Sequence, residues 1–212
     1  MIIEVKTSDF KNKCGDCKYF NTKNHIDGTC NNDKNKVKSK QRYYNSKSCV
    51  YKEIRKKILY LFLDVDGVLN NEKYIVKCYE KHHKPMHMNH VPFNPTCLNN
   101  LMVLVQSLGT LNYDVKIILS STWRLDNISY EIVDARLAEY GLKITDYTPY
   151  MDGNRGIEIK KFLSDKLYDE LLILDDDDFD IKPYYPNNLV KTNFKNGLTK
   201  DKVTKALNII IK

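Results

Sequence analysis

The sequence has 212 residues, which is enough for one sizeable core or for a core with a small appendage. Its formal net charge is +7, but residues 1–58 carry 15 Lys/Arg against 6 Asp/Glu, a net of +9 that leaves −2 for the rest of the chain. No stretch approaches the roughly 18–20 apolar residues of a membrane span and the N-terminus lacks a signal peptide's apolar segment, so we expect a soluble protein without membrane contact, in the cytoplasm (the host's cytoplasm if the chain is viral).

Four cysteines gather near the N-terminus: Cys14 and Cys17 form a Cys-x-x-Cys pair, and Cys30 and Cys49 follow. Four thiolates suffice for tetrahedral zinc, and a metal would supply folding energy that this apolar-poor segment lacks. The cluster resembles small four-cysteine metal-binding modules. We expect residues 1–57 to form a basic module that binds Zn²⁺. An iron–sulfur cluster, disulfides or free thiols are the alternatives, and the reducing cytoplasm disfavours disulfides.

Aromatic residues interleave with lysines in the same segment. Positive side chains can follow phosphates while aromatic rings stack on bases, so the pattern favours a nucleic acid partner. The alternative is a solvated basic module that only packs against its neighbour. The aromatic residues are Tyr19, Phe20, Tyr43, Tyr44 and Tyr51.

The apolar run 59–63 is typical of a strand that is buried on both faces, and it ends in Asp64, Asp66 and Gly67. The carboxyl end of such a strand is where open α/β sheets place ligands. Two neighbouring carboxylates there repel each other, which is unfavourable unless a cation or a reaction needs them. A plain Asp-Gly turn would explain Asp66 and Gly67 but not Asp64.

Residues 71–93 form a polar insert that holds four of the five histidines. A flap or minimal cap over an active site is one interpretation, and a polar surface loop is another. An accessory metal site is the third, although the spacing matches no familiar ligand pattern. The histidines are His82, His83, His87 and His90.

The rest of the chain alternates strand and helix patterns. Apolar periodicity predicts helices near 98–108, 129–140 and 203–210, with Gly109 and Gly141 closing the first two. A further helix is expected to begin at Arg155 and Gly156, and strands are expected over 114–119, 171–174 and 189–190. Such alternation indicates an α/β domain, residues 58–212, whose parallel sheet carries helices on both faces. No segment is long enough for a large cap domain.

Polar residues follow two further strands and begin one helix. Ser120, Ser121 and Arg124 come after the strand 114–119, and four consecutive aspartates, residues 175–178, end the strand 171–174. Arg155 begins the helix between them. This order of acid pair, hydroxyl, base and acid pair resembles the four motifs of the haloacid dehalogenase (HAD) superfamily. The chain looks most like the compact HAD domains of RNA-repair proteins, and the phosphatase half of polynucleotide kinase-phosphatases is a more distant likeness.

The resemblance implies a role for each of these residues. Asp64 would be the nucleophile, and Asp66 would protonate the leaving alcohol and then activate water. Ser120, or Ser121 if the register is off by one, would hydrogen-bond the phosphoryl oxygens. Arg155 would neutralise the phosphoryl group. Most of the superfamily has lysine at this position, so Lys160 and Lys161 are the fallback.

The resemblance also implies a magnesium site. Asp64, the backbone carbonyl of Asp66 and Asp176 are the expected ligands of Mg²⁺, with Asp175 or Asp177 in support. Ser121, Arg124 and Gly67 are the expected substrate-binding residues, although Arg124 is equally suited to a structural pairing with an acid. Trp123 is expected to belong to the core.

These expectations lead to one principal function and two alternatives. The principal one is a Mg²⁺-dependent phosphatase that removes terminal phosphates from RNA or DNA through an aspartyl-phosphate. The first alternative is a phosphatase of free nucleotides or another small phosphoester, for which a +9 module would have little use. The second is a non-enzymatic nucleic-acid-binding adaptor with a HAD scaffold.

Overall fold

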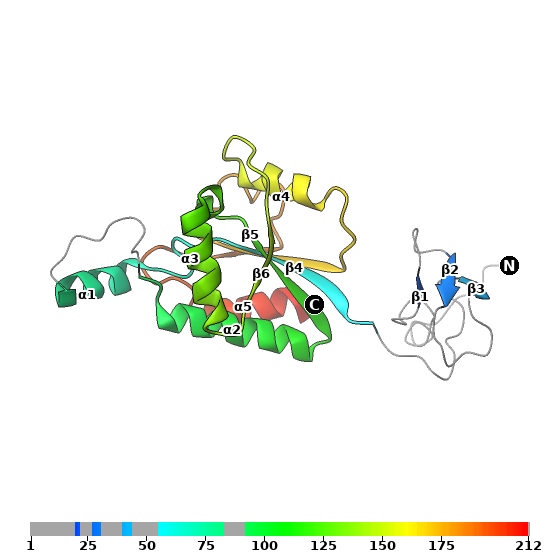
Figure 1. Cartoon of the computed structure of the whole chain (residues 1–212), viewed down its shortest axis with the longest axis horizontal. Helices are drawn as coiled ribbons and strands as arrows, with labels where there is room; N and C mark the ends of the chain where they lie inside the picture. Colours follow the sequence, from blue (N-terminus) through cyan, green and yellow to red (C-terminus); the bar gives the residue numbers. More distant parts are fainter. Residues whose placement is uncertain (1–19, 22–26, 31–39, 44–54, 83–91, 212) are drawn as a thin grey trace. The chain divides into compact units, whose positions relative to one another are not determined.

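The computed structural model describes residues 20–21, 27–30, 40–43, 55–82 and 92–211. The chain divides into two compact units, Met1–Lys56 and Lys57–Lys212 (Figure 1). None of the described helices combines the length and the apolar character that crossing a membrane requires.

The first unit contains a three-stranded antiparallel sheet of order β1-β2-β3, formed by Phe20–Asn21, Asp27–Cys30 and Lys40–Tyr43. Cys14, Cys17 and Cys49 lie outside the described residues, as does the side chain of Cys30. The zinc site therefore stays a prediction.

The second unit is built on a five-stranded parallel sheet of order β6-β5-β4-β7-β8. The α/β class and the parallel sheet expected from the sequence are confirmed. The strands are β4 (Lys57–Leu63), β5 (Tyr113–Leu119), β6 (Ile144–Tyr147), β7 (Glu170–Asp175) and β8 (Leu189–Lys191). The helices are α1 (Glu72–His82), α2 (Pro95–Thr110), α3 (Asn127–Ala138), α4 (Arg155–Leu163) and α5 (Lys200–Ile211), with a 3-10 turn η4 (Thr122–Leu125) after β5.

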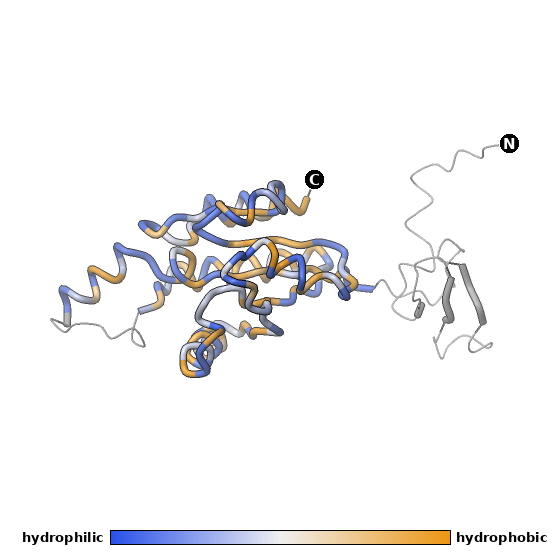
Figure 2. Tube along the Cα trace, turned by 90° about the horizontal axis from the view of Figure 1, so that it is seen from above, coloured by the Kyte–Doolittle hydropathy of each residue, from blue (hydrophilic) through white to orange (hydrophobic). Residues whose placement is uncertain are grey.

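Helices cover both faces of this sheet because alternate strand residues point to opposite sides. Leu59, Leu61 and Leu63 of β4 belong to a buried cluster that includes residues of α2, α3 and α5. Phe62 belongs to a second cluster with Phe162 of α4. Figure 1 shows α4 on one side of the sheet and α2 and α5 on the other, and Figure 2 shows apolar segments in the middle of this unit.

The structure differs from the sequence-based expectation at two places in the scaffold. Strand β6 was not predicted, because only Ile144 of its four residues is buried and the strand lies at an edge of the sheet. The prediction that Gly109 closes α2 is wrong: α2 continues to Thr110, and Asn112 adopts the positive φ of 68° after the helix. Gly141, with φ of +68°, follows α3 as expected.

The insert 71–93 contains a helix, α1, in its first half. All described residues of α1 are half-buried or exposed. His83, His87 and His90 lie outside the described residues, as does the side chain of His82, so the role of the histidines as a flap, a metal site or a surface loop stays a prediction.

Candidate active site

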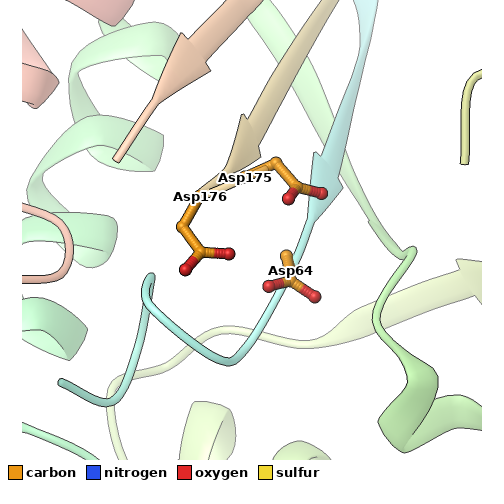
Figure 3. A group of neighbouring side chains, drawn as sticks. All are labelled: Asp64, Asp175 and Asp176. Atoms are coloured by element: carbon orange, nitrogen blue, oxygen red, sulfur yellow. The ribbon is translucent and has the colours of Figure 1, made fainter. Parts of the chain in front are cut away.

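Three carboxylates converge at the carboxyl ends of the neighbouring strands β4 and β7. Asp64 follows β4, Asp175 ends β7, and Asp176 comes next. Each offers an oxygen atom, and these atoms lie within 4.8 Å of one another (Figure 3). The backbone fixes this placement, because the Asp64 N–H donates to the Leu174 carbonyl at 3.0 Å and thereby extends the pairing of the two strands.

Arg155 supplies positive charge to this group from the first turn of α4. Its Nη1 donates to Asp64 Oδ1 at 2.9 Å and to Asp175 Oδ2 at 2.6 Å. The helix start is fixed from two directions, since Asn154 caps the Ile157 N–H and Asp180 accepts from the Arg155 N–H. Lys160 and Lys161, the fallback residues, are exposed in the last turn of α4.

Burial makes ionisation of the three acids less favourable, and the charge of Asp64 adds to this effect at Asp175 and Asp176. Burial raises the pKa of Asp64, although the Arg155 guanidinium opposes the shift. Burial and the charge of Asp64 raise the pKa of Asp175 to about 7. The same two causes raise the pKa of the half-buried Asp176. Although burial opposes its charge, Asp175 and Asp64 raise the pKa of Arg155, so the guanidinium remains a permanent cation at this site.

The three carboxylates fit a magnesium ion. Mg²⁺ prefers hard oxygen ligands and commonly takes one or two protein carboxylates. One guanidinium leaves part of the negative charge of three acids uncompensated, and a divalent cation would offset the remainder. The carboxylate of Asp66 is not a member of this group of ligand oxygens. Its backbone carbonyl was the predicted ligand, and that stays a prediction.

The four-aspartate run divides into distinct roles. Asp175 and Asp176 belong to the ligand group. The exposed Asp177 accepts from the Phe179 N–H, while its own N–H donates to Asp175 Oδ1 at 3.0 Å. Asp178 pairs with Lys191 at 2.6 Å. Asp177 and Asp178 therefore shape the turn that carries the two ligand candidates.

Gly67 lets Asp176 approach the turn after β4. It adopts φ of +68°, and a Cβ atom built on it would lie 2.2 Å from Asp176 Oδ2. A larger residue would collide with a candidate ligand as well as strain the backbone. The predicted substrate-binding role of Gly67 stays untested, and its visible role is to make room for Asp176.

Asp66 is held by two donors. Trp123 Nε1 donates to Asp66 Oδ2 at 2.9 Å, and Asn70 Nδ2 donates to Asp66 Oδ1 at 2.6 Å. The amide of Asn70 also accepts from the Gly67 N–H at 3.1 Å. The carboxyl group of Asp66 is therefore fixed to the turn after β4 and to the turn η4 after β5.

Ser120 and Ser121 place two buried hydroxyls beside the acids. Ser120 follows β5, and its N–H donates to the Leu63 carbonyl at 2.9 Å. Neither hydroxyl has a hydrogen-bond partner among the residues that the structure describes. The Ser121 hydroxyl nevertheless lies near enough to Asp64 to lower the pKa of that carboxyl against the effect of burial. Buried hydroxyls without partners are unfavourable, so a ligand with phosphoryl oxygens would satisfy them.

Arg124 is bound inside the domain. Its side chain makes five hydrogen bonds, to the carbonyls of Ser120, Ser121, Thr148 and Pro149 and to Glu158 Oε2. A guanidinium has five N–H groups, so this set leaves no donor for a substrate phosphate. The geometry favours the structural role over the predicted substrate-binding role. Arg124 holds the serine turn in place.

Three residues at this site received no functional role from the sequence. From the sequence alone, Trp123 is expected in the core, and Asn70 and Glu158 stand only as parts of motifs. Glu158 pairs with Arg124 at 2.7 Å, both side chains being only 2% exposed. The sequence did carry a signal for Glu158. It lies four positions after the helix cap and between apolar residues, which indicates burial, and a buried acid needs a partner. Nothing in the sequence indicated which residue that partner is.

Comparison with known proteins points to one family. A family model described as the HAD domain in Swiss Army Knife RNA repair proteins matches residues 60–203, a range that contains all four motifs apart from Leu59. Among solved structures, the chain is similar to the HAD domain of the effector protein Lem4 from Legionella pneumophila, with 17% identity and a TM-score of 0.40 over 74% of this chain and 94% of that chain. No curated protein matches the chain.

Proposed function

Because the chain belongs to the family of HAD domains in Swiss Army Knife RNA repair proteins, we propose that it is a phosphatase of phosphate monoesters with Asp64 as its nucleophile. The observation that carries the proposal is the pairing of the buried Asp64 with Arg155 at 2.9 Å, with the buried hydroxyls of Ser120 and Ser121 at the end of the neighbouring strand β5. This arrangement offers a nucleophile, a cation for the phosphoryl group and hydrogen-bond donors for its oxygens.

The reaction proceeds in two halves. An oxygen of Asp64 attacks phosphorus, the bond to the leaving oxygen breaks, and its electron pair stays on that oxygen, which takes the proton of the Asp66 carboxyl group. Water then attacks the phosphorus of the aspartyl-phosphate while the Asp66 carboxylate takes its proton. The Asp64 carboxylate leaves and is restored. The products are an alcohol and inorganic phosphate.

Asp64, Asp175 and Asp176 would hold Mg²⁺ in this proposal, with the Asp66 carbonyl as the further predicted ligand. When bound, Mg²⁺ would offset the negative charge of the carboxylates and of the phosphoryl oxygens. Arg155 keeps Asp64 oriented through its hydrogen bond, and Arg124 keeps the serine turn in place.

The substitution Asp64→Asn tests the nucleophile. It keeps the shape of the side chain but removes the charge that attacks phosphorus, so turnover of an aryl phosphate should fall by at least about a thousandfold. Asp165→Asn is the control, because it makes the same change at an exposed position after α4. Circular dichroism should show both variants folded. Substantial turnover by Asp64→Asn would identify another nucleophile, and an inactive wild type with Mg²⁺ would favour the adaptor.

We also propose that the substrate is a phosphorylated end of RNA or DNA. The family description and the +9 charge of residues 1–58 support this substrate class. Phosphate release from 5′- and 3′-phosphorylated oligonucleotides, compared with free nucleotides at equal concentration, tests it. A higher kcat/KM for one class of oligonucleotide end is the expected result. A preference for free nucleotides would support the small-phosphoester alternative.

A further inference from the structure

Two side chains from different turns hold the carboxyl group of Asp66. Trp123 belongs to η4, directly after the serine turn, and reaches Asp66 over 57 positions of sequence with a 2.9 Å hydrogen bond. Asn70 is fully buried and binds the other carboxyl oxygen at 2.6 Å. Phe93 packs edge-on against the Trp123 ring, with centroids 5.5 Å apart.

These two bonds fix the orientation of the carboxyl plane. Each carboxyl oxygen accepts one hydrogen bond, and every such oxygen has a second lone pair. The side chain can therefore carry a proton while both bonds remain in place. Rotation of the carboxyl group would break both bonds at once, so the structure selects one orientation of Asp66 in a partly exposed position.

We infer that Trp123 and Asn70 are positioning residues that aim Asp66 at the leaving oxygen, and that the site is adapted to phosphate esters of ordinary alcohols. This inference rests on the proposed function. An alkoxide leaves poorly unless it receives a proton, whereas a phenolate with electron-withdrawing groups leaves well without one. A sugar hydroxyl, as found at the end of a polynucleotide, belongs to the first class.

Trp123→Phe tests the orientation. It removes the Nε1 donor and retains an aromatic ring. Formation of the aspartyl-phosphate, measured as kcat/KM, should fall by about tenfold or more for an alkyl phosphate and by less than about threefold for a nitrophenyl phosphate. Hydrolysis of the aspartyl-phosphate, which also uses Asp66 and is the same for both esters, does not enter kcat/KM. Asp66→Asn should show the same selective loss in stronger form.

Phe93→Leu is the matched control for packing. It disturbs the ring against Trp123 and leaves the Nε1 hydrogen bond in place, so the ratio of the two kcat/KM values should match that of the wild type. Asn70→Ser, which lacks the amide donor, should repeat the selective loss if Trp123→Phe fails to fold. An equal fall of kcat/KM on both esters in the Trp123 and Asn70 variants, or no fall, would overturn the inference.

A second measurement tests the contact without any turnover. Trp123 is the sole tryptophan of the chain, so a ¹⁵N-labelled sample of the full chain gives a single indole N–H signal in its proton–nitrogen spectrum. A hydrogen bond to a carboxyl oxygen moves this proton downfield. Asp66→Ala should therefore move the signal upfield, and Asp165→Asn should leave it in place. An indole signal that Asp66→Ala does not move would overturn the inference.

The two experiments separate this inference from the proposed function. An inactive wild type whose indole signal responds to Asp66→Ala would refute the phosphatase proposal, and with it the role of Asp66, while leaving the contact intact. If the wild type is active and kcat/KM of the variants falls equally for both esters, the phosphatase proposal is supported and only the positioning role is refuted.

Discussion

At the scale of single residues, the site is a group of three acids around one permanent cation. Arg155 contacts Asp64 and Asp175 directly, but the pKa of each of the three acids is still raised, chiefly by burial. The folded protein therefore holds carboxylates whose ionised forms are less favourable than in the unfolded chain. A divalent cation bound there should stabilise the fold as well as serve the reaction.

The pKa of Asp175 predicts a pH-dependent response to magnesium. Because folding raises this pKa from 3.8 to about 7, the folded state holds more protons than the unfolded state between these values, and the contribution of Asp175 to stability falls as the pH rises from about 4 to about 7. Mg²⁺ binds the ionised form, so it should raise the thermal midpoint more at pH 8 than at pH 5.

Thermal unfolding followed by circular dichroism, with and without Mg²⁺, measures this difference. Asp175→Asn should reduce both the pH dependence and the response to Mg²⁺, whereas Asp165→Asn should change neither. An equal response to Mg²⁺ at both pH values, together with an unchanged response in Asp175→Asn, would place the cation elsewhere.

Gly67 gives a second prediction at this scale. Gly67→Ala should destabilise the fold and weaken Mg²⁺ binding, because the new Cβ meets both a strained φ and the Asp176 carboxylate. Gly141→Ala is the control: its φ is also +68°, but no atom lies within 4 Å of the new Cβ. The free energy of unfolding of the control should fall only by the amount that a left-handed backbone conformation costs a non-glycine residue, about 1–2 kcal/mol. Equal losses of stability and of Mg²⁺ affinity in both variants would contradict the proposed crowding.

At the scale of elements, a buried ion pair joins the turn after β5 to α4. Arg124 lies in η4, directly after the serine turn, and Glu158 lies in α4, the helix that begins with Arg155. Their ion pair therefore links the serine turn to this helix. Glu158 also accepts from the Met151 N–H at 3.0 Å, which fixes the loop before the helix. Desolvation lowers the pKa of Arg124, although Glu158 opposes the shift. The placement of hydroxyls relative to Arg155 therefore depends on this pair.

Removing one partner of the pair should leave a buried charge without compensation. Glu158→Ala should lower the free energy of unfolding by about 3–5 kcal/mol, measured by urea denaturation. Glu139→Ala is the control, because its pair with Arg136 is more than half exposed and should contribute no more than about 1 kcal/mol. Arg124→Met combined with Glu158→Leu should recover part of the loss. A Glu158→Ala variant as stable as the control would contradict the structural role of the pair.

The elements that the sequence predicted are those with a strong local pattern. The buried runs of β4, β5 and β7 and the periodic helices α2, α3 and α5 were foreseen because each pattern lies within one short segment. Strand β6 was missed because an edge strand buries little. Helix α2 continues one residue beyond Gly109 because Asn112, and not the glycine, adopts the positive φ that follows the helix. The contacts of Arg124 and Trp123 could not be foreseen, since their partners lie 34 and 57 positions away.

At the scale of the whole molecule, the chain joins a small basic unit to a slightly acidic α/β unit. The proposed zinc site would hold the four cysteines of the first unit together and supply folding energy there. The charge difference suggests a division of labour, in which the first unit binds polyanions and the second carries out the reaction. We propose this division as the reason for the +9 segment.

Removal of residues 1–56 tests the division. The truncated chain keeps the sheet, both clusters of apolar residues and the site, so it should hydrolyse a small aryl phosphate at nearly the wild-type rate. Its KM for a phosphorylated oligonucleotide should rise by about tenfold or more, because only remote binding is lost.

Salt provides a second test of the division. Oligonucleotide turnover by the full chain should fall steeply between about 50 and 200 mM salt, since each neutralised phosphate releases counterions. For single strands, the logarithm of the binding constant should fall with the logarithm of the salt concentration with a slope near about −0.7 per phosphate contact. The truncated chain should lose most of this salt dependence, and the aryl phosphate, which has no polyanionic backbone, provides the control within each preparation. Equal losses on both substrates would show that the first unit only stabilises the second, and unchanged kinetics on both would favour a small phosphoester as the substrate.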